Sequence, residues 1–285
     1  ININIYPDEM ATIADLVLPE STYLEMSAVS VRITNARYPQ IALAEPMIKT
    51  LHNTKSGDEI KYLIAQEMGL KKYMAPVGDK VLDSKIRRYN ITFQEALKKG
   101  GIISGNKGFK PLNLTELKTE SGKIQLLSPK LQEMGYHPLP WFDENWVINT
   151  KANDEFYMVT TRPPTHRHAK THNMEWLQEI TPKGVVYMNT SKAKKLGINN
   201  GDTIEISSQF GKGTTEVSLT EGIRPDTICF PHGFGQKSPF LKLSYQNGMN
   251  DGDVMPAVAK EVNIELNDPT GACLDCFMTV RVRKV

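Results

Sequence analysis

A cluster of basic side chains follows a short apolar run near the middle of the chain. Between Arg162 and His172, six of eleven residues are Arg, His or Lys, and three of the chain's six histidines lie within seven residues of one another. Guanidinium, imidazole and hydroxyl groups gathered on one loop can bind phosphate or pyrophosphate. A solvated basic loop is the alternative, because runs of charge usually lie on the surface. The pattern therefore indicates a candidate anion site without excluding that alternative.

Two predicted strands position this cluster and a second loop. Residues 156–160 have the β-branched and aromatic content of a strand, and we expect it to end at about Arg162 because Pro163 cannot continue a ladder. A further strand is predicted over residues 226–231. It leads into a glycine-rich loop, residues 232–236, where the backbone could approach a ligand closely.

The composition limits the class of protein. A chain of 285 residues with 40% hydrophobic and 23% charged residues is typical of a globular protein with one large domain or two ordinary ones. A net charge of +2 does not suggest nucleic acid, and the basic loop has no interleaved aromatic residues beyond Trp176. No apolar run reaches the length of a membrane span.

The three cysteines do not suggest a disulfide scaffold. Cys273 and Cys276 form a single CxxC pair, and only Cys229 remains, so a zinc site of four such ligands is not supported. A redox role remains open, although the pair lies close to the C-terminus and outside a βαβ pattern. We interpret the pair as structural or incidental.

The patterning predicts two units. Strand-like residues 1–5, a short helix and the apolar run 16–18 are typical of the tail of an α/β domain whose parallel strands are buried on both faces. Ser56 and Thr92 are predicted N-caps of two helices. After residue 150, at least six short strands predict a small β-barrel. We therefore expect units at 1–145, including a connecting segment, and at 150–285.

Several segments resemble the dimethyl-sulfoxide-reductase family of molybdopterin oxidoreductases. In the second unit, the resemblance to the family's molybdopterin-dinucleotide-binding domain rests on three segments: FYMVTTRPPTHRHAKTHN, VVYMNTSKAKKLGINNGDTIEISSQFG and EGIRPDTICFPHGFG. In the first, ATIADLVLPESTYLE and SGKIQLLSPKLQEMGYHPLPWF are similar to segments of the preceding domain. The segment YPQIALAEPMIKTLHNTKSGDEI is most similar to polysulfide and thiosulfate reductase catalytic subunits.

The resemblance implies a fold and a cofactor. The fold is an α/β remnant of a third domain followed by a mainly β domain, a double-psi β-barrel of the aspartate-decarboxylase-like type. The cofactor is bis(molybdopterin guanine dinucleotide) with molybdenum or tungsten, in an enzyme that reduces an inorganic sulfur compound. The catalytic metal ligand and the iron–sulfur segment have no match in this chain, which opens inside a strand without an initiator Met. We therefore expect the C-terminal part of a longer subunit, inactive and without bound cofactor on its own.

The resemblance also implies which side chains contact the cofactor. They belong to the basic loop, to the glycine-rich loop and to one later position: Thr161, Arg162, His166, His168, Thr171, Asn173, His232, Gly233, Gly235, Gln236 and Asn250. The glycines would let backbone N–H groups reach the phosphates. A plain surface or turn role is the alternative for each of these residues. No catalytic residue and no metal ligand is expected in this chain.

The implied partners are the N-terminal remainder of the same subunit, an iron–sulfur electron-transfer subunit and a membrane anchor subunit, with no nucleic acid. The implied location of the full-length protein is the periplasm. A second hypothesis comes from another class of protein. Small barrels of this kind also serve as recognition modules, so the chain could be a free-standing, non-catalytic binding subunit. An upstream reading frame with a four-cysteine segment would favour the enzyme.

Overall fold

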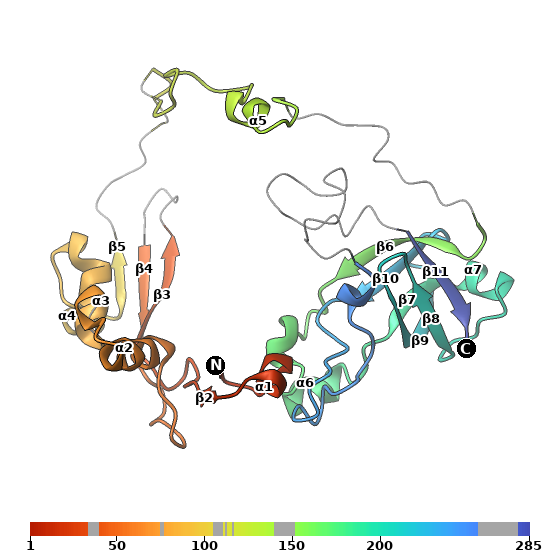
Figure 1. Ribbon diagram of the computed structural model, residues 1–285, viewed down its shortest axis with the longest axis horizontal. Coiled ribbons are helices and arrows are strands. Elements are labelled where there is room, and N and C mark those ends of the chain that lie inside the picture. Colours follow the sequence, from red (N-terminus) through yellow and green to blue (C-terminus); the bar gives the residue numbers. More distant parts are fainter. Residues whose placement is uncertain are drawn as a thin grey trace. The chain divides into compact units, whose positions relative to one another are not determined.

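The chain folds into two compact units in a computed structural model, Ile1–Ile124 and Gln125–Val285 (Figure 1). The structure describes residues 1–33, 40–74, 77–104, 111, 113–115, 117–139, 152–255 and 279–285. The boundary expected between residues 145 and 150 lies outside these described residues, as do Cys273 and Cys276. No helix among the described residues is both long enough and apolar enough to cross a membrane.

The first unit contains two small sheets. Strands β1 (Asn2–Asn4) and β2 (Val17–Pro19) pair in parallel, with helix α1 (Glu9–Ile13) between them in the chain. The antiparallel sheet has the order β3-β4-β5, and its strands are β3 (Ala28–Ile33), β4 (Gln40–Ala44) and β5 (Ile102–Ser104). The expected burial of the apolar run at 16–18 is wrong, since Leu16 is 49% and Val17 43% exposed. Among the described strands, β2 pairs only with β1, so no further strand covers it.

The first unit also contains short helices, of which the second and third described below pack on the antiparallel sheet. They are α2 (Gly57–Glu67), α3 (Asp79–Ile86) and α4 (Phe93–Lys98), with the 3₁₀ turns Lys71–Tyr73 and Arg87–Tyr89. Ile41, Ile86 and Phe93 form the buried centre of this layer. The two predicted N-caps are confirmed: Ser56 accepts a hydrogen bond from the Glu59 N–H, and Thr92 forms a capping box with Glu95.

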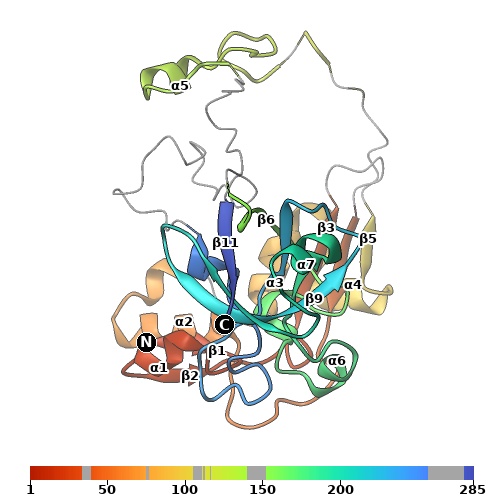
Figure 2. The ribbon, with the colours of Figure 1, turned by 90° about the vertical axis from the view of Figure 1, so that its right-hand side faces the viewer.

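The second unit contains a closed six-stranded barrel (Figure 2). Its strands are β6 (Glu155–Thr161), β7 (Val186–Asn189), β8 (Thr203–Ser207), β9 (Lys212–Thr220), β10 (Thr227–Pro231) and β11 (Thr279–Lys284). The helical elements are α5 (Pro129–Glu133), α6 (Glu175–Ile180), α7 (Thr190–Lys195) and the 3₁₀ turns η4 (His168–Thr171) and η5 (Asp251–Val254). The ring runs β10-β6-β11-β8-β9-β7. The predicted β-barrel is confirmed.

The strand pairing gives the barrel two interlocked halves. The first half is β6-β7-β8 and the second is β9-β10-β11. The first strand of each half pairs in parallel with the second strand of the other half, as β6 with β10 and β9 with β7. All other pairs in the ring are antiparallel. This exchange of partners is the double-psi arrangement that the sequence led us to expect.

Alternating apolar residues fill the barrel. Phe156 and Met158 on β6, Ile204 and Ile206 on β8, and Phe230 on β10 are all 0% exposed. On β6 the buried positions alternate with less buried ones, as expected for a strand with one face toward a core. The barrel interior is therefore a packed core, and ligand-binding groups must lie at its ends or on its outer loops.

The parallel pair β6–β10 determines where the two predicted loops begin. Thr161 and Pro231 are direct partners in the register of this pair, and both strands end there. Parallel strands end at the same edge of a sheet, so the basic loop and the glycine-rich loop leave the barrel side by side. The predicted end of β6 next to Arg162 is confirmed, because Pro163 and Pro164 follow at once.

We expect Phe156→Ala to destabilise the barrel by about 3–5 kcal/mol, because the change leaves a cavity in a packed core. Hydrogen exchange of the barrel amides during urea unfolding would report this loss separately from the first unit. Tyr187→Ala is a matched control, since Tyr187 lies on β7 and is 37% exposed, so its truncation should cost less. Equal losses for the two variants would contradict this account of the core.

Candidate anion-binding site at one edge of the barrel

The basic loop and the glycine-rich loop are in direct contact. The His232 N–H donates to the Thr161 carbonyl at 2.8 Å, which extends the β6–β10 ladder by one bond. A Cβ atom at Gly233 would lie only 3.0 Å from the backbone carbonyl carbon of His168. Segments about 70 residues apart in the chain thus form one surface at the end of the barrel.

Three cationic or polar side chains reach outward at this edge. Arg162 Nη2 lies 3.0 Å from His168 Nε2, and the rings of His168 and His232 meet edge-on with centroids 5.2 Å apart. Arg162 and His168 are exposed, and 44% of the His232 side chain is exposed. Behind them, His232 Nδ1 contacts the Oδ2 atom of the buried Asp251 at 2.6 Å. The arrangement offers a row of hydrogen-bond donors to an anion.

The proton positions in this row follow from the chemistry of its members. A guanidinium group has only donors, so His168 Nε2 must accept from Arg162 and the ring hydrogen lies on Nδ1. The positive charge of Arg162, followed by burial and the neighbouring His232, holds the pKa of His168 below its usual value. His168 is therefore a neutral donor, and Arg162 carries the fixed charge.

Two further histidines lie inward and form a stack. The rings of His166 and His172 are 4.3 Å apart and nearly parallel, and Phe234 meets both edge-on. His166 is 3% exposed; its Nδ1 atom contacts Thr171 Oγ1 at 3.3 Å and its Nε2 atom contacts the Thr181 carbonyl at 3.2 Å. Because both nitrogens have partners within the protein, the structure favours a loop-holding role for His166 rather than the cofactor contact expected from the sequence.

His172 is the most deeply buried member of the cluster. It is 0% exposed, and neither ring nitrogen has a hydrogen-bond partner among the described residues. Burial, followed by the charges of His166 and His232, lowers its pKa to about 4. His172 is therefore uncharged at neutral pH and packs as an aromatic ring behind Gly233, with Nε2 3.1 Å from the position of a Cβ there. The sequence counted His172 within the basic cluster and gave no sign of this burial.

Three other predicted contacts also hold the loops together. Thr171 Oγ1 accepts from the Arg167 N–H at 2.8 Å, and Asn173 Oδ1 accepts from the Leu243 N–H at 3.0 Å. Gln236 Nε2 donates to the Ala169 carbonyl at 3.3 Å, which joins the glycine-rich loop to the basic loop. These side chains fix the shape of the edge and leave Thr161 and Asn250 as the exposed polar neighbours of the outward row.

The glycines serve close packing. Gly233 and Gly235 have φ values of 93° and 75°, which favour glycine. A Cβ at Gly235 would lie 2.1 Å from the Asn250 nitrogen, and the Gly235 N–H already donates to the Asn247 carbonyl. This N–H is therefore not available to a phosphate, contrary to what the sequence led us to expect. The glycine instead lets the segment that carries Asn250 and Asp251 pack against the loop.

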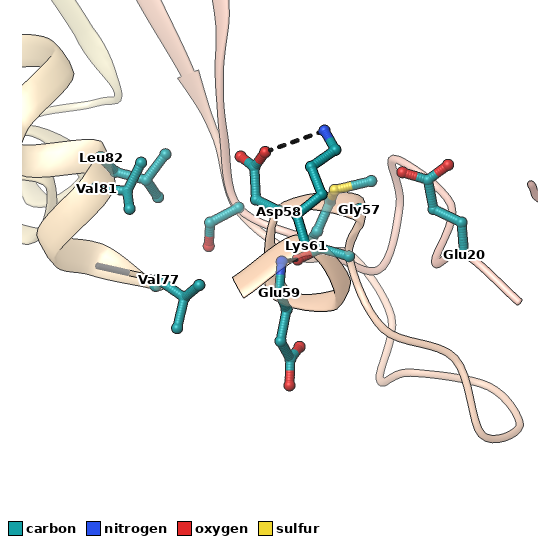
Figure 3. A pocket seen from close by; sticks show the side chains of 12 residues that line it. Glu20, Gly57, Asp58, Glu59, Lys61, Val77, Val81 and Leu82 are labelled. Atoms are coloured by element: carbon teal, nitrogen blue, oxygen red, sulfur yellow. Dashed lines mark hydrogen bonds and ion pairs between the residues drawn. The ribbon is translucent and has the colours of Figure 1, made fainter. Parts of the chain in front are cut away.

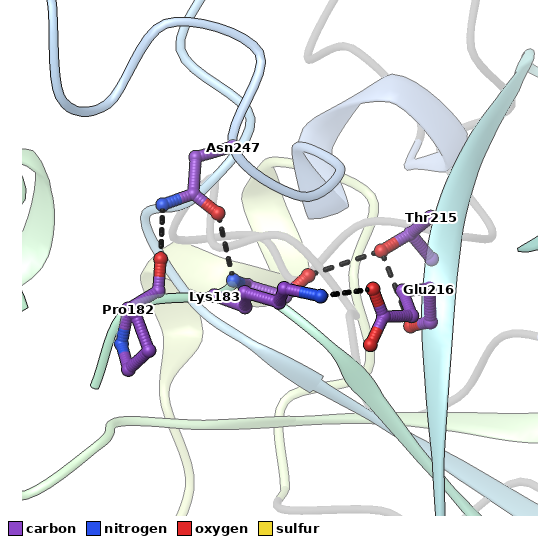
Figure 4. A network of polar contacts seen from close by, with 6 residues as sticks. Pro182, Lys183, Thr215, Glu216 and Asn247 are labelled. Atoms are coloured by element: carbon purple, nitrogen blue, oxygen red, sulfur yellow. Dashed lines mark hydrogen bonds and ion pairs between the residues drawn. The ribbon is translucent and has the colours of Figure 1, made fainter. Parts of the chain in front are cut away.

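Asn247, which precedes this segment in the chain, belongs to a polar network (Figure 4). Asn247 Nδ2 donates to the Pro182 carbonyl at 2.7 Å, and Asn247 Oδ1 accepts from the Gly184 N–H at 3.0 Å. Lys183 and Glu216 form an ion pair at 2.6 Å beside it. A cavity of about 290 Å³ lies here, and its lining includes Asn247 but none of the outward row.

A larger cavity of about 440 Å³ lies in the first unit, next to the start of α2 (Figure 3). Its polar lining includes Glu20, Asp58 and Lys61, and Lys61 pairs with Asp58 at 3.7 Å. None of the side chains predicted from the sequence to contact a cofactor lines it. The candidate site is therefore the barrel edge.

The second unit thus contains a closed double-psi barrel with a cationic row at the shared end of two parallel strands. Residues 156–265 match the family model of the molybdopterin dinucleotide binding domain. This part of the chain is a domain of that kind, as found in the dimethyl-sulfoxide-reductase family.

Individual relatives cover nearly all of the chain. It is 24% identical to the thiosulfate reductase molybdopterin-containing subunit PhsA of Salmonella typhimurium, over 92% of this chain and 38% of that protein. It is also 24% identical to the dimethyl sulfoxide reductase DmsA of Haemophilus influenzae, over 82% of this chain and 32% of that protein. The chain thus spans about a third to two fifths of the length of these relatives.

Among solved structures, acetylene hydratase from Pelobacter acetylenicus matches 99% of this chain and 39% of its own, with a TM-score of 0.80 and 19% identity. This likeness shows the fold alone. The names of the two relatives above contain different substrates, thiosulfate and dimethyl sulfoxide, so these matches do not assign one reaction to this chain.

We expect the stability of the folded chain to fall as the pH drops from 6.5 to about 4, by up to about 3 kcal/mol from His172 alone. In the unfolded chain the imidazole takes up its proton near pH 6.5, whereas the folded state resists protonation down to about pH 4. The unfolded state therefore binds more protons across this window. Above pH 6.5 the residue contributes no slope.

Urea unfolding at a series of pH values would measure this slope, and His172→Phe should flatten it while keeping an aromatic ring against Phe234. His137→Gln is the control, because it removes an exposed imidazole elsewhere in the same unit. A slope that is the same in the wild type and in His172→Phe would show that burial of His172 is not the cause.

Proposed function

We propose that the edge of the barrel binds the guanosine diphosphate part of a molybdopterin guanine dinucleotide, with Arg162, His168 and His232 as its main phosphate contacts. The supporting observation is that these three donors, from two distant segments, form one outward row at the shared end of β6 and β10. Thr161 and Asn250 flank the row as further polar contacts.

The residues fit the chemistry of this group. A diphosphate diester carries two negative charges, and their removal from water is tolerable only when donors and opposite charge replace the solvent. The Arg162 fork supplies a permanent charge and can donate two parallel hydrogen bonds. Asp251, a carboxylate next to the row, is turned toward His232 and buried. When bound, the cofactor supplies the redox chemistry, while the barrel binds and orients it.

The wider assignment concerns the whole protein. We propose that the chain is the C-terminal part of a molybdenum or tungsten oxidoreductase subunit that reduces an inorganic sulfur compound, of the polysulfide or thiosulfate type. The alignment with thiosulfate reductase PhsA over 92% of this chain supports the substrate class. An iron–sulfur segment and the metal ligand would belong to the remainder of the subunit. An iron–sulfur electron-transfer subunit, a membrane anchor subunit and a periplasmic location complete this proposal.

The surface of the first unit supports contact with such a remainder. Met10 and Ile13 on α1 are 59% and 76% exposed, and Val17 on β2 is 43% exposed. A parallel sheet of two strands is unusual, because parallel strands normally lie in larger sheets that are covered on both faces. Apolar side chains on both α1 and β2 are therefore suited to packing against further chain.

We expect Arg162→Ala to weaken binding of GDP-mannose by the full 285-residue chain about 10- to 100-fold, the loss typical of a charge-assisted hydrogen bond. GDP-mannose is a suitable probe, since its diphosphate is a diester like that of the dinucleotide. Isothermal titration calorimetry would measure the affinity.

The control is Arg224→Ala, which removes an exposed arginine paired with Asp226 ahead of β10, away from the end of that strand that carries His232. Its affinity should match that of the wild type. Absence of binding to the wild type, or equal losses in the two variants, would refute the proposed site.

We also expect the purified chain to show no thiosulfate or polysulfide reductase turnover with a chemical electron donor. The reason is that the metal ligand and the iron–sulfur segment would lie in the remainder of the subunit. Spectrophotometric oxidation of reduced methyl viologen would measure the rate. Turnover above that of a heat-treated sample would contradict this part of the proposal.

A further inference from the structure

We propose that His232 binds the ligand's phosphate as an imidazolium, that ligand binding is coupled to uptake of one proton by this ring, and that Asp251 is the positioning residue that makes this coupling work. The inference rests on the proposed function, since it concerns the same diphosphate. Beyond the proposed function, it assigns a proton to the Nε2 atom of His232 and a positioning role to Asp251.

Two contacts hold His232, one at its backbone and one at its ring. Its backbone N–H is held by the Thr161 carbonyl, and its Nδ1 atom lies 2.6 Å from Asp251 Oδ2. Asp251 is 4% exposed and begins η5, which Asn250 caps by accepting from the Gly252 N–H at 2.9 Å. The far end of η5 is tied to the barrel, because Ser208 Oγ donates to the Val254 carbonyl at 2.7 Å. The carboxylate is therefore held still behind the ring.

This arrangement determines what the outer nitrogen can do. An ionised carboxylate only accepts, so the Nδ1 hydrogen of His232 points at Asp251. In the neutral ring, Nε2 then carries a lone pair, which would repel a phosphate oxygen. Only the imidazolium presents an Nε2–H donor. A phosphate that uses His232 must therefore bind the protonated ring, and the ligand's charge and that of Asp251 both stabilise it.

Charged and titratable groups face His232 from two elements. Asp251, from η5, favours the protonated ring. From the basic loop, Arg162 opposes it through the adjoining His168, while the buried His172 behind Gly233 carries no charge at neutral pH. A phosphate bound next to both Arg162 and His232 would add negative charge beside the ring, and this charge favours the imidazolium form.

His168 provides an internal contrast. Its Nε2 accepts from Arg162, so this ring already presents its hydrogen on Nδ1 and needs no proton to act as a donor. The two neighbouring imidazoles thus differ in which nitrogen carries the hydrogen, because His168 is paired with a guanidinium and His232 with a carboxylate. Proton uptake on binding is expected from His232 and not from His168.

The test is calorimetric titration of the full chain with GDP-mannose, whose diphosphate diester does not titrate near neutral pH. Titrations in buffers of different ionisation enthalpy give the number of protons taken up. We expect uptake in the wild type to approach one proton as the pH rises from 6 to 8.5. Over the range where the free ring has lost its proton, the affinity should fall by about tenfold per pH unit.

Three variants separate the roles. His232→Gln should bind without proton uptake and with little pH dependence. Asp251→Asn keeps the size of the side chain but removes the charge, so uptake should appear only at lower pH. Asp253→Asn is the matched control in the same turn, since Asp253 pairs with Lys237 instead, and it should behave as the wild type does.

The outcomes are distinguishable. Binding of GDP-mannose by the wild type without proton uptake, or with the same uptake in His232→Gln, overturns the assignment of the proton while the proposed site survives. Identical uptake in Asp251→Asn and the wild type at every pH overturns the positioning role of Asp251. Absence of binding to the wild type at any pH removes the proposed function, and this inference with it.

Discussion

The parallel pairing of β6 with β10 is the constraint on which the candidate site depends. It places Thr161 beside Pro231, so that Arg162 and His232 begin their loops as neighbours although 70 positions separate them in the chain. An antiparallel pair would have put these strand ends at opposite edges of the sheet. Everything else at the edge, from the contact at Gly233 to the row of donors, follows from this one register.

Burial then divides the histidines of this edge into two kinds. His166 and His172 lie inside, stacked on each other and on Phe234, and they behave as packing residues. His168 and His232 lie outside, where Arg162 and Asp251 determine which nitrogen carries the hydrogen. The ring of His172 has no hydrogen-bond partner within the described part of the chain, and it resists protonation, which keeps a positive charge out of the core behind the glycine turn.

The sequence predicted the local features of the chain well. The end of β6 at the two prolines, the caps Ser56 and Thr92 and the strands of the barrel all depend on residues close in sequence, and each is confirmed. Burial depends on what covers an element in space, which a single sequence does not reveal. For that reason the apolar run before Pro19 was wrongly expected to be buried, and His172 was not distinguished from its neighbours.

The predicted cofactor contacts show the same limit of prediction from sequence. The sequence identified the two loops that lie together, the basic loop and the glycine-rich loop, because the residue types of both are suited to binding an anion. It could not separate side chains that face a ligand from those that hold the loops, such as Thr171, Asn173 and Gln236, since both kinds are polar. The role of Asp251 behind His232 is likewise a matter of distance. The sequence pointed to that segment only through the contact implied for Asn250.

The interlocked halves of the barrel link the site to the stability of the whole domain. β6 takes its parallel partner from the second half and β9 takes its own from the first, so neither half can complete its sheet alone. The edge that carries Arg162 and His232 therefore exists only in the closed barrel. A ligand bound across both loops would stabilise that closed state in proportion to the logarithm of its concentration over its Kd. Ligand binding and closure of the barrel are thus thermodynamically linked.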